Sequence, residues 1–500
     1  MSTGQFSAAT SVDDPPDDAP DPRRWFVLGV GIAALFMTLL DATIVNVALP
    51  SMGRTLHADP AELQWVVSGF ALAFGIVPIV AGRLGDDRGR RRMLLIGIGG
   101  FVLSSFLAGL APVPAVLLVA RALQGLFGGL VNPQVSGLIQ QMFPLSERPR
   151  AFGLLGLNVG LAQALGPVVG GVIIAIGGTQ LGWRLTFWIN VPVGAIAFVL
   201  AWRLLPRDAR RPEPRRLDLP GAGLLALGLG GILYPVVEYD ADRNATRLLL
   251  VLPALGVLAV FWWWERGPGR RRGYPLIDTG LFRVRSYSDG LGLALLYFAG
   301  FAGTALVLSL FLQDGLGFSA LESGLVATGF AAGVAIGAPV AGRLIGRFGR
   351  QVLVVGLVTF LVGIIAALGS VRLSSGVLAP ADVAWLLVPA LFVAGLGGGA
   401  VITPNQSLSL EEIDVSGGST AGGMLQTAQR VGAAIGAASL TAVFYGQVAG
   451  SAPASGQARA AHYGHAYSAA LLVSVVMGGA ALVLAVREVR RTRRLQKSTG

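Results

Sequence analysis

The 500-residue chain contains no cysteine, three histidines and a single lysine, Lys497, near its C-terminus. Without cysteine it has no disulfide framework, no thiolate nucleophile and no zinc–thiolate site. A phosphate-binding loop needs Gly-Lys-Ser/Thr at its turn, and a zinc-protease helix needs His-Glu-x-x-His; neither is present. His462 and His465 have no further ligand candidates beside them, so we expect no metal site. These absences argue against an enzyme.

Charge is also scarce, because only 13% of the residues are Asp, Glu, Lys or Arg, against about 25% in soluble domains. Hydrophobic residues make up 53%, glycine contributes 71 residues, and the mean hydropathy is +0.67. The net charge of +11 does not indicate a nucleic-acid partner, because the arginines flank apolar segments. The composition indicates a polytopic membrane protein surrounded by lipid.

Fourteen segments are apolar over the length of about 20 residues that a helix needs to cross a bilayer. They are 25–49, 62–82, 93–112, 115–138, 151–176, 183–202, 219–237, 247–264, 290–312, 323–342, 351–370, 383–404, 418–445 and 466–486. Long continuous runs favour helices over the short alternating strands of a barrel. We therefore predict an all-α membrane protein with 14 transmembrane helices.

The arginines predict the orientation of these spans. With the N-terminus inside, 30 of the 38 Lys and Arg residues lie on the cytoplasmic side, six lie outside and two lie within spans. We therefore expect both termini in the cytoplasm. No signal peptide is visible, so we expect the first span to be retained in the plasma membrane. The use of Arg for Lys, with abundant Ala and Gly, is compatible with a GC-rich bacterial genome.

An internal repeat divides the chain. Ala81–Arg90 recurs 260 residues later as Ala341–Arg350, with six of ten positions identical, each time after the second helix of a six-helix group. Duplicated helical halves with a midplane site are typical of secondary transporters; recurrent Gly-Arg turns are the simpler alternative. We predict a disordered N-terminus (1–22), a six-helix bundle (23–205), a linker with two inserted helices (206–288), a second six-helix bundle (289–487) and a basic tail (488–500).

Several motifs resemble the major facilitator superfamily, and within it the fourteen-helix drug:proton antiporters. They are Leu40-Asp-Ala-Thr-Ile-Val-Asn-Val-Ala-Leu-Pro50, the loop Gly82 to Arg92, Arg121-Ala-Leu-Gln-Gly125, Gly166-Pro-Val-Val-Gly-Gly171 and Trp183 to Gly194. The resemblance covers residues 24 to 486. It implies a major-facilitator fold of two six-helix bundles plus two inserted helices, and multidrug or antibiotic efflux driven by a proton gradient.

Asp41 and Arg121 stand inside spans that run in opposite directions, at depths that nearly coincide. Charged groups in hydrocarbon are costly, and they usually pair or mark a pathway. A static ion pair between two helices is one reading. The other is that Asp41 binds a proton or a cationic substrate while Arg121 biases its ionisation. The resemblance implies a role in proton coupling for both.

Two further groups of residues carry predicted conformational roles. Gly82, Asp86, Gly89, Arg90 and Arg91 form the loop after the second span, where Asp86 is expected to face the start of the thirteenth helix near Gly417 and Gly418; ordinary positive-inside charge is the alternative. The fifth helix is rich in small residues, which permit close packing. The resemblance gives its antiporter motif, Gly153, Gly166, Pro167, Gly170 and Gly171, a role in sealing against proton leak, although Ala162 replaces a usual glycine.

Candidates for the substrate cavity are the polar residues Asn46, Gln124, Gln426 and Arg430 and aromatic residues that include Phe298 and Phe301. We expect a monomer, in contact with lipid, that exports hydrophobic or cationic small molecules in exchange for protons and needs no cofactor. One alternative is export of an endogenous metabolite, siderophore, lipid or amino acid. Another is a membrane sensor or assembly subunit that transports nothing.

Overall fold

The computed structural model describes residues 21–208, 218–242, 249–267, 275–448 and 456–499, and within these ranges no residue lies in a strand. The predicted disordered segment 1–22 falls outside them except for its last two residues. The helices of the first half are α1 (Arg24–Leu56), α2 (Pro60–Ile76), α3 (Pro78–Arg88), α4 (Arg90–Leu110), α5 (Pro114–Met142), α6 (Arg148–Trp188) and α7 (Asn190–Leu204).

The linker contributes α8 (Leu219–Asp242), α9 (Val251–Arg266) and the short η2 (Thr279–Arg283). The second half consists of α11 (Arg285–Leu310), η3 (Phe311–Gly315), α12 (Ala320–Phe348), α13 (Gln351–Ser374), α14 (Pro380–Ser409), η4 (Val415–Gly417), α15 (Gly418–Val448) and α16 (Gly456–Thr499).

These helices correspond to fourteen spans in the described residues. Ten segments are long and apolar enough to cross a membrane, and α2 and α3 together form another, bent by 46° where Pro78 cannot continue the hydrogen-bond ladder. One of the ten, Arg148–Leu204, is 57 residues long and reverses at Gly178, whose φ is +65°, so it supplies two spans. Helix α8 contains a shorter apolar segment, Leu219–Pro235, and α9 packs beside it; counting both gives fourteen.

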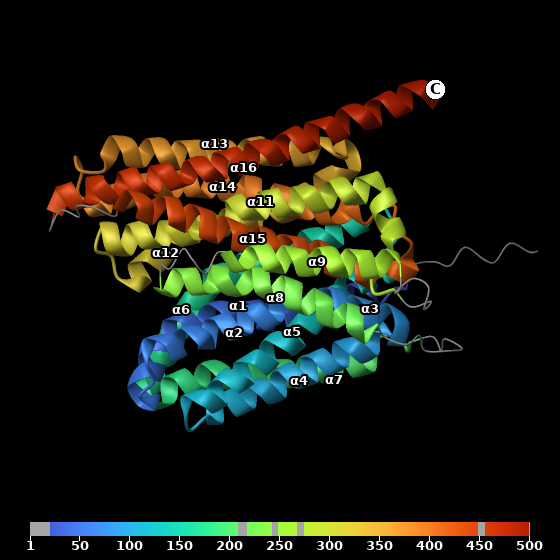
Figure 1. Ribbon diagram of the computed structural model, residues 1–500, viewed down its shortest axis with the longest axis horizontal. Coiled ribbons are helices and arrows are strands. Elements are labelled where there is room, and N and C mark those ends of the chain that lie inside the picture. The colour runs from blue at the N-terminus through green and yellow to red at the C-terminus, as the bar shows by residue number, and fades with distance from the viewer. Residues whose placement is uncertain (1–20, 209–217, 243–248, 268–274, 449–455, 500) are drawn as a thin grey trace, which may run out of the picture.

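The helices form two groups with the inserted pair beside their junction (Figure 1). In that view α1 to α7 occupy the lower part and α11 to α16 the upper part, while α8 and α9 lie between them. Helix α8 packs on α2 of the first group and on α15 of the second. Trp65 of α2 stacks on Tyr234 of α8 with ring centroids 5.7 Å apart.

Buried apolar side chains form separate cores. The largest lies within the second half, and another joins the first half to α8, α9 and the adjacent ends of α14 and α15. Large apolar residues also cover the outside of both groups; Leu103, Val119, Ile196, Val355 and Val476 are examples. A surface of this kind suits a hydrocarbon environment rather than water.

The sequence repeat has a structural cause at the turns that end α3 and α12. Gly89 and Gly349 occupy equivalent positions and have φ values of +104° and +53°, which residues with a Cβ rarely adopt. Each turn lies at the same end of the bundle as the starts of α1, α4 and α13, where Arg23, Arg24, Arg90 and Arg350 stand. We call this the Arg-rich end.

Candidate transport site

Asp41 and Arg121 form an ion pair inside the first half. An Arg121 Nη1 proton is donated to Asp41 Oδ2 at 2.5 Å, and the two residues are 0% and 1% exposed. Arg121 also donates to Gln124 Oε1 at 2.9 Å and to the Val66 carbonyl at 3.0 Å. The pair therefore links α1 to α5 and α2. Asp41 and Arg121, which were predicted to lie at similar depths in the membrane, are in direct contact.

The second carboxylate oxygen of Asp41 is held by amides. Asn190 Nδ2 donates to Oδ1 at 2.8 Å and Gln124 Nε2 at 3.3 Å. Both amides also donate to the Ser105 hydroxyl at 3.0 Å. The sequence prediction did not single out Asn190 or Ser105, although Asn190 lies in the recognised segment Trp183 to Gly194. Donors from α5 and α7 therefore surround the carboxylate of Asp41.

The ring of Phe70 covers the other side of Arg121, with the guanidinium carbon 4.2 Å from the ring centroid. A cation over an aromatic face gains electrostatic stabilisation, and the ring excludes water from the pair. Asp41, Arg121 and Gln124 thus form one enclosed cluster. Gln124, which was predicted to line the substrate cavity, belongs to this cluster and is not among the described residues that line the cavity.

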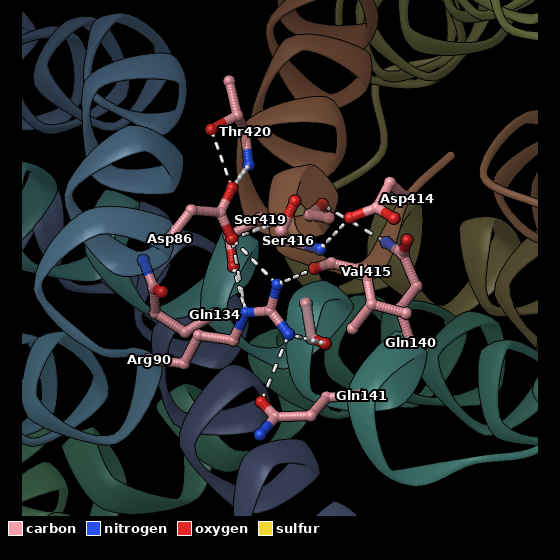
Figure 2. A network of polar contacts seen from close by, with 12 residues as sticks. Asp86, Arg90, Gln134, Gln140, Gln141, Asp414, Val415, Ser416, Ser419 and Thr420 are labelled. Atoms are coloured by element: carbon pink, nitrogen blue, oxygen red, sulfur yellow. Dashed lines mark hydrogen bonds and ion pairs between the residues drawn. The ribbon is translucent and has the colours of Figure 1, made fainter. Parts of the chain in front are cut away.

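Asp86 joins the two halves at the Arg-rich end (Figure 2). Its carboxylate accepts hydrogen bonds from the backbone N–H of Ser419 at 3.1 Å, the backbone N–H of Thr420 at 2.7 Å and the Thr420 hydroxyl at 2.8 Å. These groups form the first turn of α15, where unsatisfied N–H groups and the helix dipole favour an anion. The predicted contact between Asp86 and the start of this helix is present.

Arg90 occupies the centre of the same network (Figure 2). It donates to Asp86 at 2.8 Å and to Ser419 Oγ at 2.9 Å, and also to the Val415 carbonyl. On its own half it donates to the Gly137 carbonyl at 2.8 Å. Every edge of the planar guanidinium is therefore used, which a lysine cannot reproduce.

Neighbouring residues shape this contact without joining it directly. Gly82 lies against the backbone of α15, because a Cβ there would be 2.8 Å from Thr420 Cα. The backbone N–H of Arg91 donates to Asp208, and its side chain donates to the Trp202 carbonyl, so it points away from the second half. Asp414 precedes α15, and its hydrogen bonds from the Ser416 side chain and backbone hold the pKa of its carboxyl below the usual range.

Helix α6 uses its small residues on two faces. Gly153 and Gly160 approach α12, where a Cβ on Gly160 would be 2.7 Å from Ala335 N. Gly166 and Gly170 approach α1, where a Cβ on Gly166 would be 2.7 Å from Thr43 Cβ. These glycines permit close helix contact on both sides.

The remaining two residues of the antiporter motif differ from these glycines. A Cβ on Gly171 would have nothing within 4 Å, so its packing does not require a glycine. Pro167 lines the cavity between the halves.

The cavity between the halves has a volume of about 570 Å³, within the range of sites for drug-sized ligands. It reaches from Leu35 and Ile402, nearer the Arg-rich end, to Gln313 and Ser323 at the opposite helix ends. Asn46 and Arg430, both predicted for the cavity, line it. Gln426 is not among the described lining residues; it is buried, and its Nε2 lies 3.4 Å from Ser136 Oγ in the contact between the halves.

Arg430 is the charged residue among the described residues that line this cavity. It lies in the middle of α15, with its guanidinium carbon 4.6 Å from the centroid of the Phe74 ring on α2. The rest of the lining is apolar or carries amide and hydroxyl groups. The site thus combines an enclosed ion pair, a polar contact between the halves and a cavity large enough for an organic molecule.

The comparisons with known proteins agree on one family. The family model described as Major Facilitator Superfamily matches residues 31–264 and 290–500. A probable actinorhodin transporter of Streptomyces coelicolor is 38% identical over 88% of this chain and 78% of its own length. The puromycin resistance protein pur8 of Streptomyces alboniger is 35% identical over 88% of this chain and 86% of its own.

A solved structure supports the same fold. The human organic anion transporter MFSD10 (TETRAN) superposes with a TM-score of 0.63 and covers 92% of this chain and 100% of that one. Its sequence is 17% identical, so this likeness concerns the fold alone.

Proposed function

Because this chain belongs to the Major Facilitator Superfamily, we propose that it is a proton-coupled antiporter that exports drug- or antibiotic-like small molecules by alternating access. The relatives named for actinorhodin and puromycin support this class of substrate. The observation that carries the coupling is the enclosed Asp41–Arg121 pair beside the cavity. Asp41 is the proton site, and no cofactor takes part.

The pair supplies a mechanism for coupling. With Arg121 and the amides of Gln124 and Asn190 in place, the carboxylate of Asp41 is stabilised without a proton. A movement of α1 relative to α5 would separate the charges, and a buried carboxylate without its partner takes up a proton. The conformation of the first half thereby sets the proton occupancy of Asp41.

The polar contact at the Arg-rich end supplies the gate. In the described residues, hydrogen bonds that Asp86 accepts and that Arg90 and Gln140 donate hold the two halves together there. The cavity reaches the opposite helix ends. The Arg-rich end is the cytoplasmic end in our proposal, which puts both termini in the cytoplasm and the protein, as a monomer, in the plasma membrane. The structure then corresponds to a state closed toward the cytoplasm.

Transport by the purified protein tests this function. Wild type and Asp41→Asn are reconstituted into proteoliposomes, a proton gradient is imposed, and flux of puromycin, ethidium and pyrenesulfonate is followed. Flux in the wild type that depends on the gradient and disappears in Asp41→Asn is the expected result. Gradient-driven flux that persists in Asp41→Asn overturns the assignment of Asp41, and a wild type that transports none of these compounds overturns drug export.

A matched control is available in Asp59→Asn. This exposed carboxylate caps the start of α2 and accepts from the Glu62 backbone N–H at 2.7 Å. None of its hydrogen bonds in the described residues is to Asp41 or Arg121. It should leave gradient-driven flux unchanged.

A further inference from the structure

The charge of the cavity differs from that expected for a carrier of cations. Of the described residues that line it, none is acidic, and Arg430 carries the one full charge. The carboxylate of Asp41 is 0% exposed and bound by Arg121, Asn190 and Gln124. A cationic molecule in this cavity would therefore meet a positive charge and no counterion.

Arg430 has unused donors. Within the described ranges it forms neither a hydrogen bond nor an ion pair, and its guanidinium lies on the face of the Phe74 ring. A guanidinium has five N–H donors. The ring face attracts its charge but supplies no oxygen or nitrogen atom to accept a hydrogen bond from them. An unpaired cation at this depth of a membrane protein is costly, so a ligand that supplies an acceptor gains that free energy on binding.

A second donor stands beside it. Gln429 lines the same cavity, and its Nε2 is buried without a hydrogen-bond acceptor. Leaving a buried donor unsatisfied is unfavourable. Two adjacent residues of α15 that line the cavity thus carry N–H groups with no acceptor among the described residues.

The neighbouring helix α11 adds aromatic side chains to the lining. Phe298 and Phe301 of α11 line the cavity with ring centroids 5.5 Å apart. Aromatic side chains offer large apolar faces to a planar ligand. Amide side chains, which can donate or accept, also line the cavity; Asn46, Asn132 and Gln163 are examples.

We infer that the cavity selects aromatic molecules that carry an acidic group, and that Arg430 with Gln429 binds the anion while Phe298 and Phe301 contact the rings. This inference rests on the proposed function and specifies its substrate class, in place of the cationic molecules that the sequence predicted. It also has an electrical consequence. One-for-one exchange of an outgoing anion for an incoming proton moves two positive charges inward, whereas exchange of a cation for a proton moves none.

Matched pyrene probes test the charge selectivity. Pyrenesulfonate and pyrenylmethyl-trimethylammonium share one ring system and carry opposite charges. Their binding is measured in nanodiscs by energy transfer from tryptophan, for wild type, Arg430→Gln, Arg430→Lys and Arg372→Gln. Arg372 is an exposed arginine of α13, so its replacement removes an equal charge away from the cavity.

The expected result is tighter binding of the sulfonate by wild type and by Arg372→Gln. Arg430→Gln should weaken it by about 10- to 100-fold, the size of one or two charge-assisted hydrogen bonds, and should leave the ammonium probe unchanged or bound more tightly. Arg430→Lys should keep part of the affinity because it keeps the charge. Preference of wild type for the ammonium probe, or sulfonate binding that is unchanged in Arg430→Gln, overturns the inference.

Binding and flux separate this inference from the proposed function. Sulfonate binding that depends on Arg430 supports the inference even if a proton gradient drives no flux. The absence of flux would contradict the proposed antiport only. Proton-coupled flux of the ammonium probe that is unaffected by Arg430→Gln overturns the inference and leaves antiport standing. In liposomes that transport the sulfonate, a potassium diffusion potential without a pH gradient should also drive its movement.

Discussion

The Asp86→Asn substitution keeps the size of the side chain and removes the charge that holds the halves together at the Arg-rich end. Asp86 accepts three hydrogen bonds from the first turn of α15, two from backbone N–H groups and one from the Thr420 hydroxyl. An amide has only one oxygen to accept them, and its NH2 group faces the remaining donors.

The size of the effect follows from these contacts. A hydrogen bond to a charged group contributes about 1.5–3 kcal/mol. The loss of one or two such bonds, partly replaced by water when the halves separate, shifts the equilibrium between closed and open by about 2–4 kcal/mol. Since about 1.4 kcal/mol corresponds to a factor of ten, the ratio of open to closed protein should rise about 30- to 700-fold.

Distance measurements between spin labels can detect this shift. The chain has no cysteine, so Leu145→Cys and Phe348→Cys introduce the only two thiols, one on each half, at the Arg-rich end of the bundle. In the labelled protein that keeps Asp86, the closed arrangement with its short label distance should dominate. When Asp86→Asn is added, a longer distance between the labels should appear. Asp208→Asn is the control, because Asp208 caps α4 through Arg91 N and Arg92 N. An unchanged distance distribution in Asp86→Asn would refute the role given to this network.

Three further substitutions follow from the same geometry. Arg90→Lys should also lengthen the label distance, because an ammonium cannot reach the acceptors on both halves that the guanidinium joins. Gly166→Ala should reduce gradient-driven flux at least severalfold because its Cβ meets Thr43, whereas Gly171→Ala should leave flux unchanged; equal effects would contradict the packing argument. Asn190→Leu removes a donor to Asp41 and should slow gradient-driven flux. Substrate affinity, measured by binding, should stay within about twofold of the wild-type value. A loss of affinity would instead place Asn190 at the substrate.

Much of the fold was predictable from the sequence because a membrane imposes a fixed span length. The helical class, the superfamily and the major-facilitator fold are confirmed, and the described helices are compatible with the predicted fourteen. The hairpin within α6 was also predicted, as separate spans at 151–176 and 183–202. The position of α8 and α9 against α2 and α15 was not, since hydropathy gives the length of a helix and not its neighbours.

The site shows where sequence reasoning ended. Depth along the helix predicted that Asp41 and Arg121 could meet. Which other side chains contact them depends on the direction in which each residue points around its helix. Gln124 stands three residues after Arg121, on the same helix face, and this spacing could have placed it with the pair rather than in the cavity. Asn190 approaches Asp41 from α7, 149 residues away in the chain, and no local pattern marks such a contact.

Direction around the helix also separates the glycines of α6. Gly166 lies 13 residues after Gly153, which at about 100° per residue puts it about 220° around the helix. The two glycines therefore contact different partners, α1 and α12. The sequence showed that the helix is rich in small residues, and helical periodicity separates those that face α12 from those that face α1.

Proton release on substrate binding tests the central claim most directly. Wild type and Asp41→Asn are purified into weakly buffered detergent solution, and a substrate identified by flux, with no titratable group of its own near neutral pH, is added while the pH is recorded. Coupling through Asp41 predicts that the wild type releases protons as the substrate binds and that Asp41→Asn binds it without release. Equal proton release by the two proteins would contradict the account.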